Sequence, residues 1–321
     1  MLAILLVTFP FFALVLLGYL AASRRLLPLE AIPGLNSFVL YFALPCMLYR
    51  FGASTPLAQL LDPALFLTYL FCALVMVGFV VAVSMNERVR WNDAAFGALV
   101  AAFPNTGFMG VPLLVALLGA AAAGPAIVTI VVDLIITSSL CIALSRLDGA
   151  GSRGFGLAGI SALKGVAANP MPWAIVAGAV ASAAGVTLPQ PAQQTLGLLA
   201  DAASPVALFT IGAVLARSHW LAAQGSHPAP PLRDVLPLVL FKLLLHPLLV
   251  LLVGVAAIQL GAPLERSALL VIVLVAALPS ASNVSLLAER FGADNGRIAR
   301  IILLSTAAAF VTFSAAVALL R

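Results

Sequence analysis

Two short stretches place a helix-breaking proline beside small polar residues in the middle of long apolar runs. The first is Pro104, Asn105, Thr106 and Gly107, within the apolar run 93–118. Proline lacks an N–H, and its ring clashes with the carbonyl four residues earlier, so a helix breaks or kinks there. Asn and Thr side chains cap the starts of helices, and glycine relaxes the backbone. The sequence therefore predicts two half-helices that meet within this run.

The second stretch lies in the apolar run 264–289, where Pro279 and Ser280 are followed by Ser282 and Asn283. Helix N-termini carry unsatisfied N–H groups and a partial positive charge, so the helix ends that follow the two breaks favour an anion. The helix ends that precede the breaks offer carbonyl groups, which suit a proton, Na⁺ or water. In the alternative interpretation both prolines are ordinary kinks, and the polar side chains only satisfy the freed backbone groups.

Four ionisable residues lie inside apolar runs, where charge is costly and marks functional sites by default: Asp133, Asp201, Lys242 and His246. Lys242 and His246 are four residues apart and share one helix face. His246 lies about 16 Å and Asp133 about 13 Å into a core of about 30 Å, from opposite sides. We expect these two at similar depth, as a proton-coupling pair or as a static contact. Lys242 either joins this polar network or extends to the cytoplasmic interface. Asp201 either binds a cation or repels one charge state of an anion.

No motif of a soluble enzyme accompanies these residues. The sequence has no P-loop, no dinucleotide fingerprint, no HExxH motif and no Ser, His and Asp at recognisable catalytic spacing. Cys46, Cys72 and Cys141 lie in apolar runs without metal-like spacing, so they are expected to be core residues without disulfides. The sequence predicts no enzyme, no metal site and no cofactor apart from a coupling proton or Na⁺.

The composition indicates a membrane environment for all of these residues. The chain is 63% hydrophobic and 8% charged, with a mean hydropathy of +1.17, which excludes water-soluble folds. Each apolar run is close to the length of about 20 residues that spans a bilayer as a helix. The sequence predicts an all-α membrane protein with ten transmembrane helices, at 2–22, 34–53, 63–85, 93–118, 124–145, 170–186, 194–216, 235–260, 264–289 and 297–320.

These runs, numbered spans 1 to 10 in chain order, show an internal symmetry. The interrupted spans 4 and 9 are five apart, and so are spans 2 and 7, which carry Pro45 and Pro205 as further predicted breaks. Because five is odd, the two halves insert with opposite orientation, as in transporters with inverted repeats. The prediction is a 5+5 inverted repeat, with repeats at 1–146 and 170–321 and a Gly-rich cytoplasmic linker at 147–169.

The basic residues predict the orientation of the spans. Most of the 16 Lys and Arg residues lie in the odd-numbered loops, which the positive-inside rule assigns to the cytoplasm. Both termini are then outside. The first run lacks a positive n-region, so we expect it to remain as a helix and not to be a signal peptide. Because the basic residues determine topology, we expect no nucleic-acid partner, and the partners predicted here are the lipid bilayer and a small ligand.

Four segments resemble the auxin efflux carrier family, which holds plant exporters and bacterial carriers and is related to the bile-acid sodium symporters. They are FPNTGFMGVPLLVALLG in span 4, ANPMPWAIVAG in span 6, ASPVALFTIGAVLA in span 7 and ALPSASNVSLLAERFG in span 9. The resemblance implies that helices 4 and 9 cross at their breaks, and that a scaffold of spans 1, 2, 6 and 7 faces a transport domain of spans 3–5 and 8–10. It also implies a homodimer in the bacterial inner membrane and an elevator-like movement. Asp201 departs from the family, which more often has an uncharged residue at that position.

The leading hypothesis is a secondary carrier for small organic anions, such as malonate-like or auxin-like acids, with its site at the two breaks. The alternatives are a passive anion channel, an ion-coupled symporter of the bile-acid type, and a membrane sensor that binds the ligand without moving it. The short loops leave little room for a signalling domain, which weighs against the sensor.

Overall fold

The computed structural model of the chain describes residues 2–55, 61–146, 170–223 and 231–320, and within these ranges it is helical, without a β-strand. The predicted linker 147–169 lies outside the described residues. Six described helices are long and apolar enough to cross a membrane. The fold is therefore of the all-α, membrane-spanning class. Contacts divide the chain into two units, each described by itself below.

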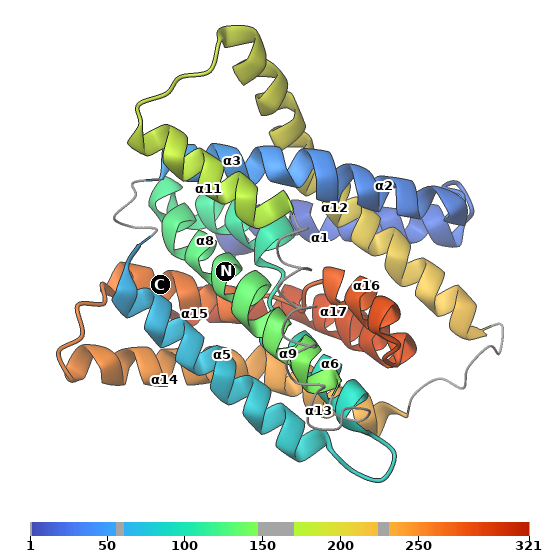
Figure 1. Ribbon diagram of the computed structural model, residues 1–321. Helices are drawn as coiled ribbons and strands as arrows, with labels where there is room; N and C mark the ends of the chain where they lie inside the picture. The colour runs from blue at the N-terminus through green and yellow to red at the C-terminus, as the bar shows by residue number, and fades with distance from the viewer. Residues whose placement is uncertain (1, 56–60, 147–169, 224–230, 321) are drawn as a thin grey trace. The chain divides into compact units, whose positions relative to one another are not determined.

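Unit 1 comprises Met1–Asp62, Thr106–Val128 and Asn169–Ser226. In this unit α1 packs along α12, and α3 packs against α11 and α12 (Figure 1). Its elements are α1 (Leu2–Ser23), η1 (Leu29–Ala31), α2 (Ile32–Phe38), η2 (Val39–Ala43), α3 (Leu44–Ser54), η3 (Thr106–Gly110), α7 (Val111–Leu118), η4 (Ala120–Ala122), most of α8 (Ala123–Val131), α11 (Pro170–Ala183) and α12 (Gln190–Ala223).

The composition of unit 1 agrees in part with the scaffold that the family resemblance implies. Predicted spans 1, 2, 6 and 7 all lie in it. The second half of span 4 and the start of span 5 also belong to unit 1, although the resemblance implies that they lie in the transport domain. They group with unit 1 because α7 packs against α1, and η3 packs against α12.

Glycines at two helix crossings let the helices of unit 1 approach closely. A Cβ on Gly18 of α1 would collide with the carbonyl oxygen of Phe209, and a Cβ on Gly212 of α12 would collide with that of Val15. The contact between α3 and α11 is built in the same way around Gly52, where a Cβ would lie 2.7 Å from the carbonyl oxygen of Ile175. Small residues at such crossings allow backbone-to-backbone packing, which drives helix association in membranes.

The predicted helix breaks at Pro45 and Pro205 are absent from the structure. α12 continues through Pro205, and Pro45 lies in the first turn of α3, directly after the π-helical η2. Pro45 lies within one continuous helical run, Leu29–Ser54, and the π-helical turn before it widens the spiral where its ring would otherwise meet the carbonyl four residues earlier. In α12 the missing N–H frees only the carbonyl of Asp201, one turn earlier.

Unit 2 comprises Pro63–Asn105, Thr129–Ala168 and His227–Arg321. In this unit α5 packs against α6 and α14, α14 against α15, and α17 against α13 and α16. Its elements are α5 (Pro63–Ser84), α6 (Trp91–Ala102), the end of α8, η5 (Val132–Thr137), α9 (Ser138–Ser145), α13 (Leu232–Leu240), η7 (Phe241–Leu245), α14 (His246–Gln259), α15 (Arg266–Ala276), α16 (Asn283–Phe291) and α17 (Asn295–Leu320).

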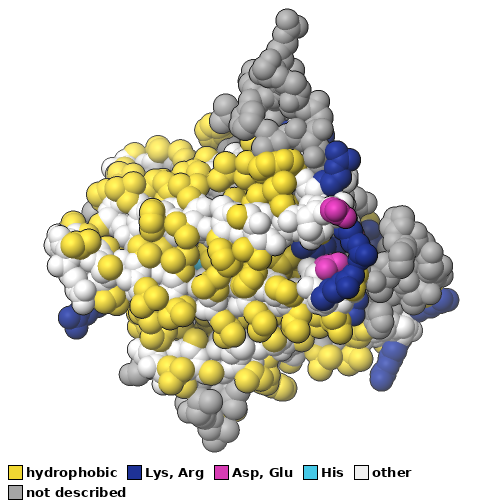
Figure 2. Space-filling model, turned by 90° about the horizontal axis from the view of Figure 1, so that it is seen from below, with side chains coloured by type: hydrophobic (Ala, Val, Ile, Leu, Met, Phe, Trp, Pro, Cys, Tyr) yellow, Lys and Arg dark blue, Asp and Glu magenta, His cyan; other side chains and the backbone are white. Residues whose placement is uncertain are grey.

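Large apolar side chains are exposed along the helices, as expected of surfaces that face lipid. On η7 and α14, Leu244, Leu248 and Leu252 recur every four residues and are 55%, 50% and 60% exposed. Figure 2 shows hydrophobic side chains over most of the face in view, whereas most of the Lys, Arg, Asp and Glu side chains in view lie at one side of it. The three cysteines are free, and Cys72 and Cys141 are buried.

Candidate functional site

The two interrupted stretches pair with each other through their backbones within unit 2. α6 ends at Ala102 and α15 ends at Ala276, and an antiparallel β-bridge joins Pro104 to Ser280. The N–H of Asn105 donates to the carbonyl of Pro279 at 2.8 Å, and the N–H of Ala281 donates to the carbonyl of Phe103 at 2.9 Å. Each break therefore satisfies backbone groups that the other leaves without a helical partner, which apolar surroundings require.

Polar side chains around this pairing are buried and only partly satisfied. Asn105 is 4% exposed and Ser280 is fully buried. The N–H of Ser280 donates to the hydroxyl of Ser305 on α17 at 3.3 Å. Within the described part of the chain, the hydroxyl of Ser280 and the side-chain oxygen of Asn283 have no hydrogen-bond partner. Buried polar atoms without a partner are rare in proteins, so these two indicate a place where a ligand or water binds.

The predicted set of residues at the breaks divides between the two units. Thr106 and Gly107 are the first two residues of η3 in unit 1, and Thr106 is fully buried. A Cβ added to Gly107 would lie 4.0 Å from the side chain of Leu44. The capping of the following half-helix by the Asn105 side chain stays a prediction. The remaining six residues lie in unit 2: Pro104, Asn105, Pro279, Ser280, Ser282 and Asn283.

A second polar cluster in unit 2 surrounds the carboxylate of Asp133, which is fully buried. The hydroxyl of Tyr69 on α5 donates to Asp133 Oδ2 at 2.9 Å, and the hydroxyl of Thr137 donates to Oδ1 at 3.2 Å. Tyr69 is not among the residues that the sequence predicts for the site, although a tyrosine in an apolar span carries a hydroxyl that needs a partner. The Tyr69 ring also lies against the ring of His246, with 6.2 Å between the ring centroids.

Lys242 belongs to the same cluster and does not extend to the membrane interface, so that alternative is wrong. Its side chain is fully buried, and Nζ donates to the carbonyl of Ala276 at 2.7 Å. Nζ also lies 3.2 Å from Nδ1 of His246. Asp133 and His246 thus both contact Tyr69, one through its hydroxyl and the other through its ring, and the roles proposed for the pair stay predictions.

Two ionisable residues of this cluster lie in π-helical turns, which the sequence does not predict. Asp133 is in η5 and Lys242 is in η7. η7 precedes Pro247, but η5 contains no proline. In η5 the hydroxyl of Ser138 donates to the carbonyl of Asp133, five residues earlier, at 2.8 Å. Short π-helical segments are frequent at functional sites, since they shift side chains out of the regular α-helical register.

Asp201 belongs to unit 1, whereas the residues of this cluster belong to unit 2. Its Oδ1 is 2.6 Å from a guanidinium nitrogen of Arg50 on α3. The two side chains are 69% and 41% exposed. The Asp201 carboxylate is thus paired with an arginine of the same chain, and both roles proposed for it, binding a cation and repelling one charge state of an anion, stay predictions.

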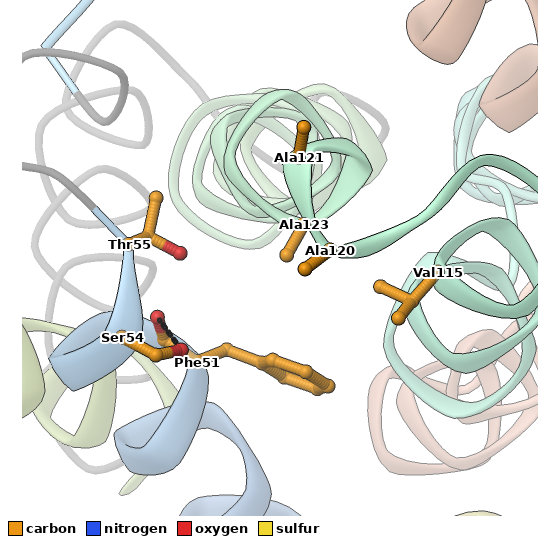
Figure 3. A pocket seen from close by; sticks show the side chains of 7 residues that line it. All are labelled: Phe51, Ser54, Thr55, Val115, Ala120, Ala121 and Ala123. Carbon is orange, nitrogen blue, oxygen red and sulfur yellow. Dashed lines mark hydrogen bonds between the residues drawn. The ribbon is translucent and has the colours of Figure 1, made fainter.

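Unit 1 also contains a cavity of about 280 Å³. Figure 3 shows Phe51, Ser54 and Thr55, at the end of α3, on one side of the cavity, with alanines of η4 and α8 and Val115 of α7 on the other. The Ser54 hydroxyl donates to the carbonyl of Phe51 at 3.2 Å. Because no charged side chain of the described residues lines this cavity, these residues offer little to an organic anion.

A buried arginine connects three helix starts in unit 2. From the sequence alone, the basic residues are expected only to set the orientation of the spans in the membrane. Arg297 of α17 is 5% exposed. Its Nε donates to the carbonyl of Asp234 in α13, and Nη1 donates to the carbonyl of Asp93 in α6, both at 3.2 Å. The carboxylate of Asp93 accepts the N–H of Asp294 at 2.8 Å. This network holds the start of α6 beside the start of α17.

Together these features define a helical membrane protein with an interrupted, partly unsatisfied polar site, which is the architecture of a transporter. The family model described as "Membrane transport protein" matches residues 4–153 and 154–317. The chain therefore belongs to this family of membrane transport proteins, which agrees with the resemblance to auxin efflux carriers. Membership indicates a membrane transporter and not an enzyme.

Two relatives illustrate this membership. A protein of Rhizobium meliloti (strain 1021) named "Putative malonate transporter" is 29% identical over 313 residues, which cover 97% of this chain and 94% of that protein. A protein of Escherichia coli (strain K12) named "Uncharacterized transporter YfdV" is 28% identical over 287 residues, covering 88% of this chain and 86% of that protein.

Proposed function

We propose that the chain is a secondary carrier that moves small organic anions across the membrane, with its substrate site at the crossing of the interrupted spans 4 and 9. The observation that carries this proposal is the backbone pairing of Phe103–Asn105 with Pro279–Ala281. Both breaks meet at one place, which ordinary independent kinks would not require. There the unpartnered oxygen atoms of Ser280 and Asn283 lie beside the start of α16, whose N–H groups favour an anion.

The substrate class follows from the chemistry of this site and from a relative. The predicted site residues are neutral donors and acceptors, which can bind a carboxylate and still release it. The similarity to a protein named as a malonate transporter supports a small dicarboxylate as the first candidate. A monocarboxylate of auxin type is the second candidate, because the auxin efflux carriers belong to the same family.

The finer architecture is part of the proposal. Ten spans in a 5+5 inverted repeat are supported by the apolar helices of the described residues, since each of the ten predicted runs contains one of them. We further propose that spans 3–5 and 8–10 carry the substrate in an elevator-type movement, and that the carrier is a homodimer. The division into two units supports separable bodies, with the second half of span 4 as the exception.

The location and orientation also remain proposals. We place the carrier in the bacterial inner membrane with both termini on the outer side, because most basic residues lie in the loops that are then cytoplasmic. A coupling proton or Na⁺ is the remaining open choice, and the cluster of Asp133, Lys242 and His246 is our candidate for coupling.

Ligand binding by the purified protein tests the substrate class. We expect malonate or a related carboxylate to raise the Tm in detergent, because a ligand at 100 times its Kd stabilises the folded state by about 2.7 kcal/mol. The uncharged diester dimethyl malonate is the matched control and is expected to leave the Tm unchanged. Equal effects of the acid and the diester would contradict an anion site.

Transport in proteoliposomes separates a carrier from a channel and from a sensor. A carrier shows faster uptake of labelled substrate when unlabelled substrate is present on the other side, because the loaded site returns more quickly. A channel shows flux without this acceleration. A sensor shows binding by thermal shift but no flux, and that result would overturn the proposed function.

A further inference from the structure

The C-terminal end of α15, within predicted span 9, has a carbonyl group that is not bonded within the helix. At this end of the helix, the N–H of Ala277 donates to the carbonyl of Val273, and the N–H of Leu278 donates to the carbonyl of Val275, both at 3.0 Å. The carbonyl of Ala276 takes instead the ammonium of Lys242, at 2.7 Å. Helix C-termini carry unsatisfied carbonyl groups and a partial negative charge, which together attract cations. Broken helices of transporters use such ends to hold Na⁺ or H⁺.

One of the two contacts of the Lys242 ammonium, the backbone carbonyl at a helix end, is a ligand that a small monovalent cation would also have. Nζ contacts a backbone carbonyl and a ring nitrogen of His246, and in the described residues no carboxylate lies within 4 Å of it. The Asp133 carboxylate is held by the hydroxyls of Tyr69 and Thr137. A fully buried lysine without a direct carboxylate partner is unusual, so its position demands a role.

We propose that Lys242 is a covalently attached cation that occupies the end of α15 in place of a free monovalent ion. The ion site is thereby filled by the chain itself, and neither folding nor transport requires Na⁺ at this position. Ala276, whose carbonyl holds the ammonium, lies three residues before Pro279, so the attached charge lies near the crossing. Its benefit to an anionic substrate rests on the proposed function, whereas its role as a cation does not.

A purely structural role is the competing explanation, in which Lys242 only ties η7 to α15. The two roles differ in what can replace the side chain. A cation site emptied by Lys242→Ala should accept n-propylammonium, which has the same heavy atoms as the side chain beyond Cβ. Lys242→Met removes the charge but fills the space, so it should accept no cation. This pair of variants separates loss of charge from the opening of a cavity.

The test is the Tm of purified protein in detergent at one pH and constant ionic strength. We expect the wild-type Tm to be the same in NaCl and in choline chloride. Lys242→Ala should have a lower Tm that rises with the concentration of n-propylammonium chloride, and choline should not reproduce this rise. Lys242→Met should show no such rise.

The opposite results would overturn the proposal. One is a Na⁺-specific rise in the wild-type Tm, which needs no variant and therefore decides the question even where Lys242→Ala does not fold. The other is an equal response of Lys242→Ala and Lys242→Met to n-propylammonium, including no response by either. If no carboxylate raises the wild-type Tm, the proposed function fails, while the cation result is still decided.

Discussion

Asn105 lies where two interrupted helices pair, and its backbone and side chain have different tasks there. The backbone N–H donates to the carbonyl of Pro279, so a substitution of the side chain leaves the backbone pairing of the two breaks intact. The side chain is almost fully buried, in the unit that also holds the unpartnered oxygen atoms of Ser280 and Asn283. This separation makes Asn105 the best residue for testing the site without disrupting the fold.

We predict that Asn105→Ala lowers substrate transport by about tenfold or more, since a hydrogen bond to a charged group contributes about 1.5–3 kcal/mol. The amount of folded protein, measured by size-exclusion chromatography in detergent, should remain close to that of the wild type. Asn36→Ala, at a partly buried position of α2 in unit 1, is the control and should transport normally. Normal uptake by a folded Asn105→Ala protein would remove this residue from the site.

Asp133 distinguishes proton coupling from a static contact. Asp133→Asn keeps the shape of the side chain and an acceptor for the Tyr69 hydroxyl but removes the charge. If the residue couples transport to protons, exchange of substrate should continue, while accumulation driven by a pH gradient is lost. A static contact predicts instead that both activities fall together. Uptake driven by the gradient at the wild-type level would show that Asp133 is not the proton carrier.

At the scale of residues, sequence reasoning identified the ionisable members of the cluster but not how they connect. Charge in an apolar run is visible in any sequence, which is why Asp133, Lys242 and His246 stand out. The bond from Lys242 to the Ala276 carbonyl is invisible, because one partner is a backbone atom 34 positions away. Tyr69 is missed for a similar reason, since one tyrosine among apolar residues carries no pattern.

At the scale of elements, the two helices α1 and α12 cross so closely that glycine is required at the contact. Gly212→Ala would force the backbones apart, and overpacking of this kind costs about 1–3 kcal/mol. We predict a lower Tm in detergent for this variant. Gly197→Ala in the same helix is the matched control, because nothing lies within 4 Å of its added methyl group.

Gly197→Ala should stabilise the helix slightly, by about 0.5–1 kcal/mol, because alanine loses less backbone freedom than glycine. Equal Tm values for the two variants would mean that α1 and α12 do not pack through Gly18 and Gly212. The comparison needs only purified protein and is independent of any substrate.

The elements also show where sequence patterns mislead. Pro104 and Pro279 interrupt their helices, whereas Pro205 does not and Pro45 lies in the first turn of a helix. The difference lies in the neighbours. At the two breaks, an N–H and a carbonyl of each segment pair with the other segment, which lowers the cost of leaving the helix. A proline without such a partner leaves the helix continuous, and local sequence contains no information about that partner.

At the scale of the whole molecule, the inverted repeat makes a prediction about sidedness. Cysteines introduced at Ala120, after span 4, and at Ala293, after span 9, should react with a membrane-impermeant maleimide from opposite sides. The background protein has Cys46, Cys72 and Cys141 replaced by alanine. Labelling of both positions from one side would refute the repeat and the ten-span topology together, and solubilised protein, in which both should react, is the control.

The sequence predicted the helical membrane class and the positions of the apolar helices well, because hydropathy depends on local composition. It did not predict the boundary between the two units, which separates Asn105 from Thr106 and Val128 from Thr129. Those boundaries fall inside predicted spans 4 and 5, since α7 and η3 pack against α1 and α12. Long-range packing of this kind has no signature within a single hydrophobic run.

The backbone pairing at the crossing has a consequence for how such proteins diversify. The hydrogen bonds between Phe103–Asn105 and Pro279–Ala281 use only main-chain atoms, which nearly every amino acid provides. Side chains at positions 105, 280 and 283 can therefore change without dismantling the architecture that presents them. A lineage can acquire a new cargo through a few substitutions here, in the way that antibodies acquire new antigens on a constant framework.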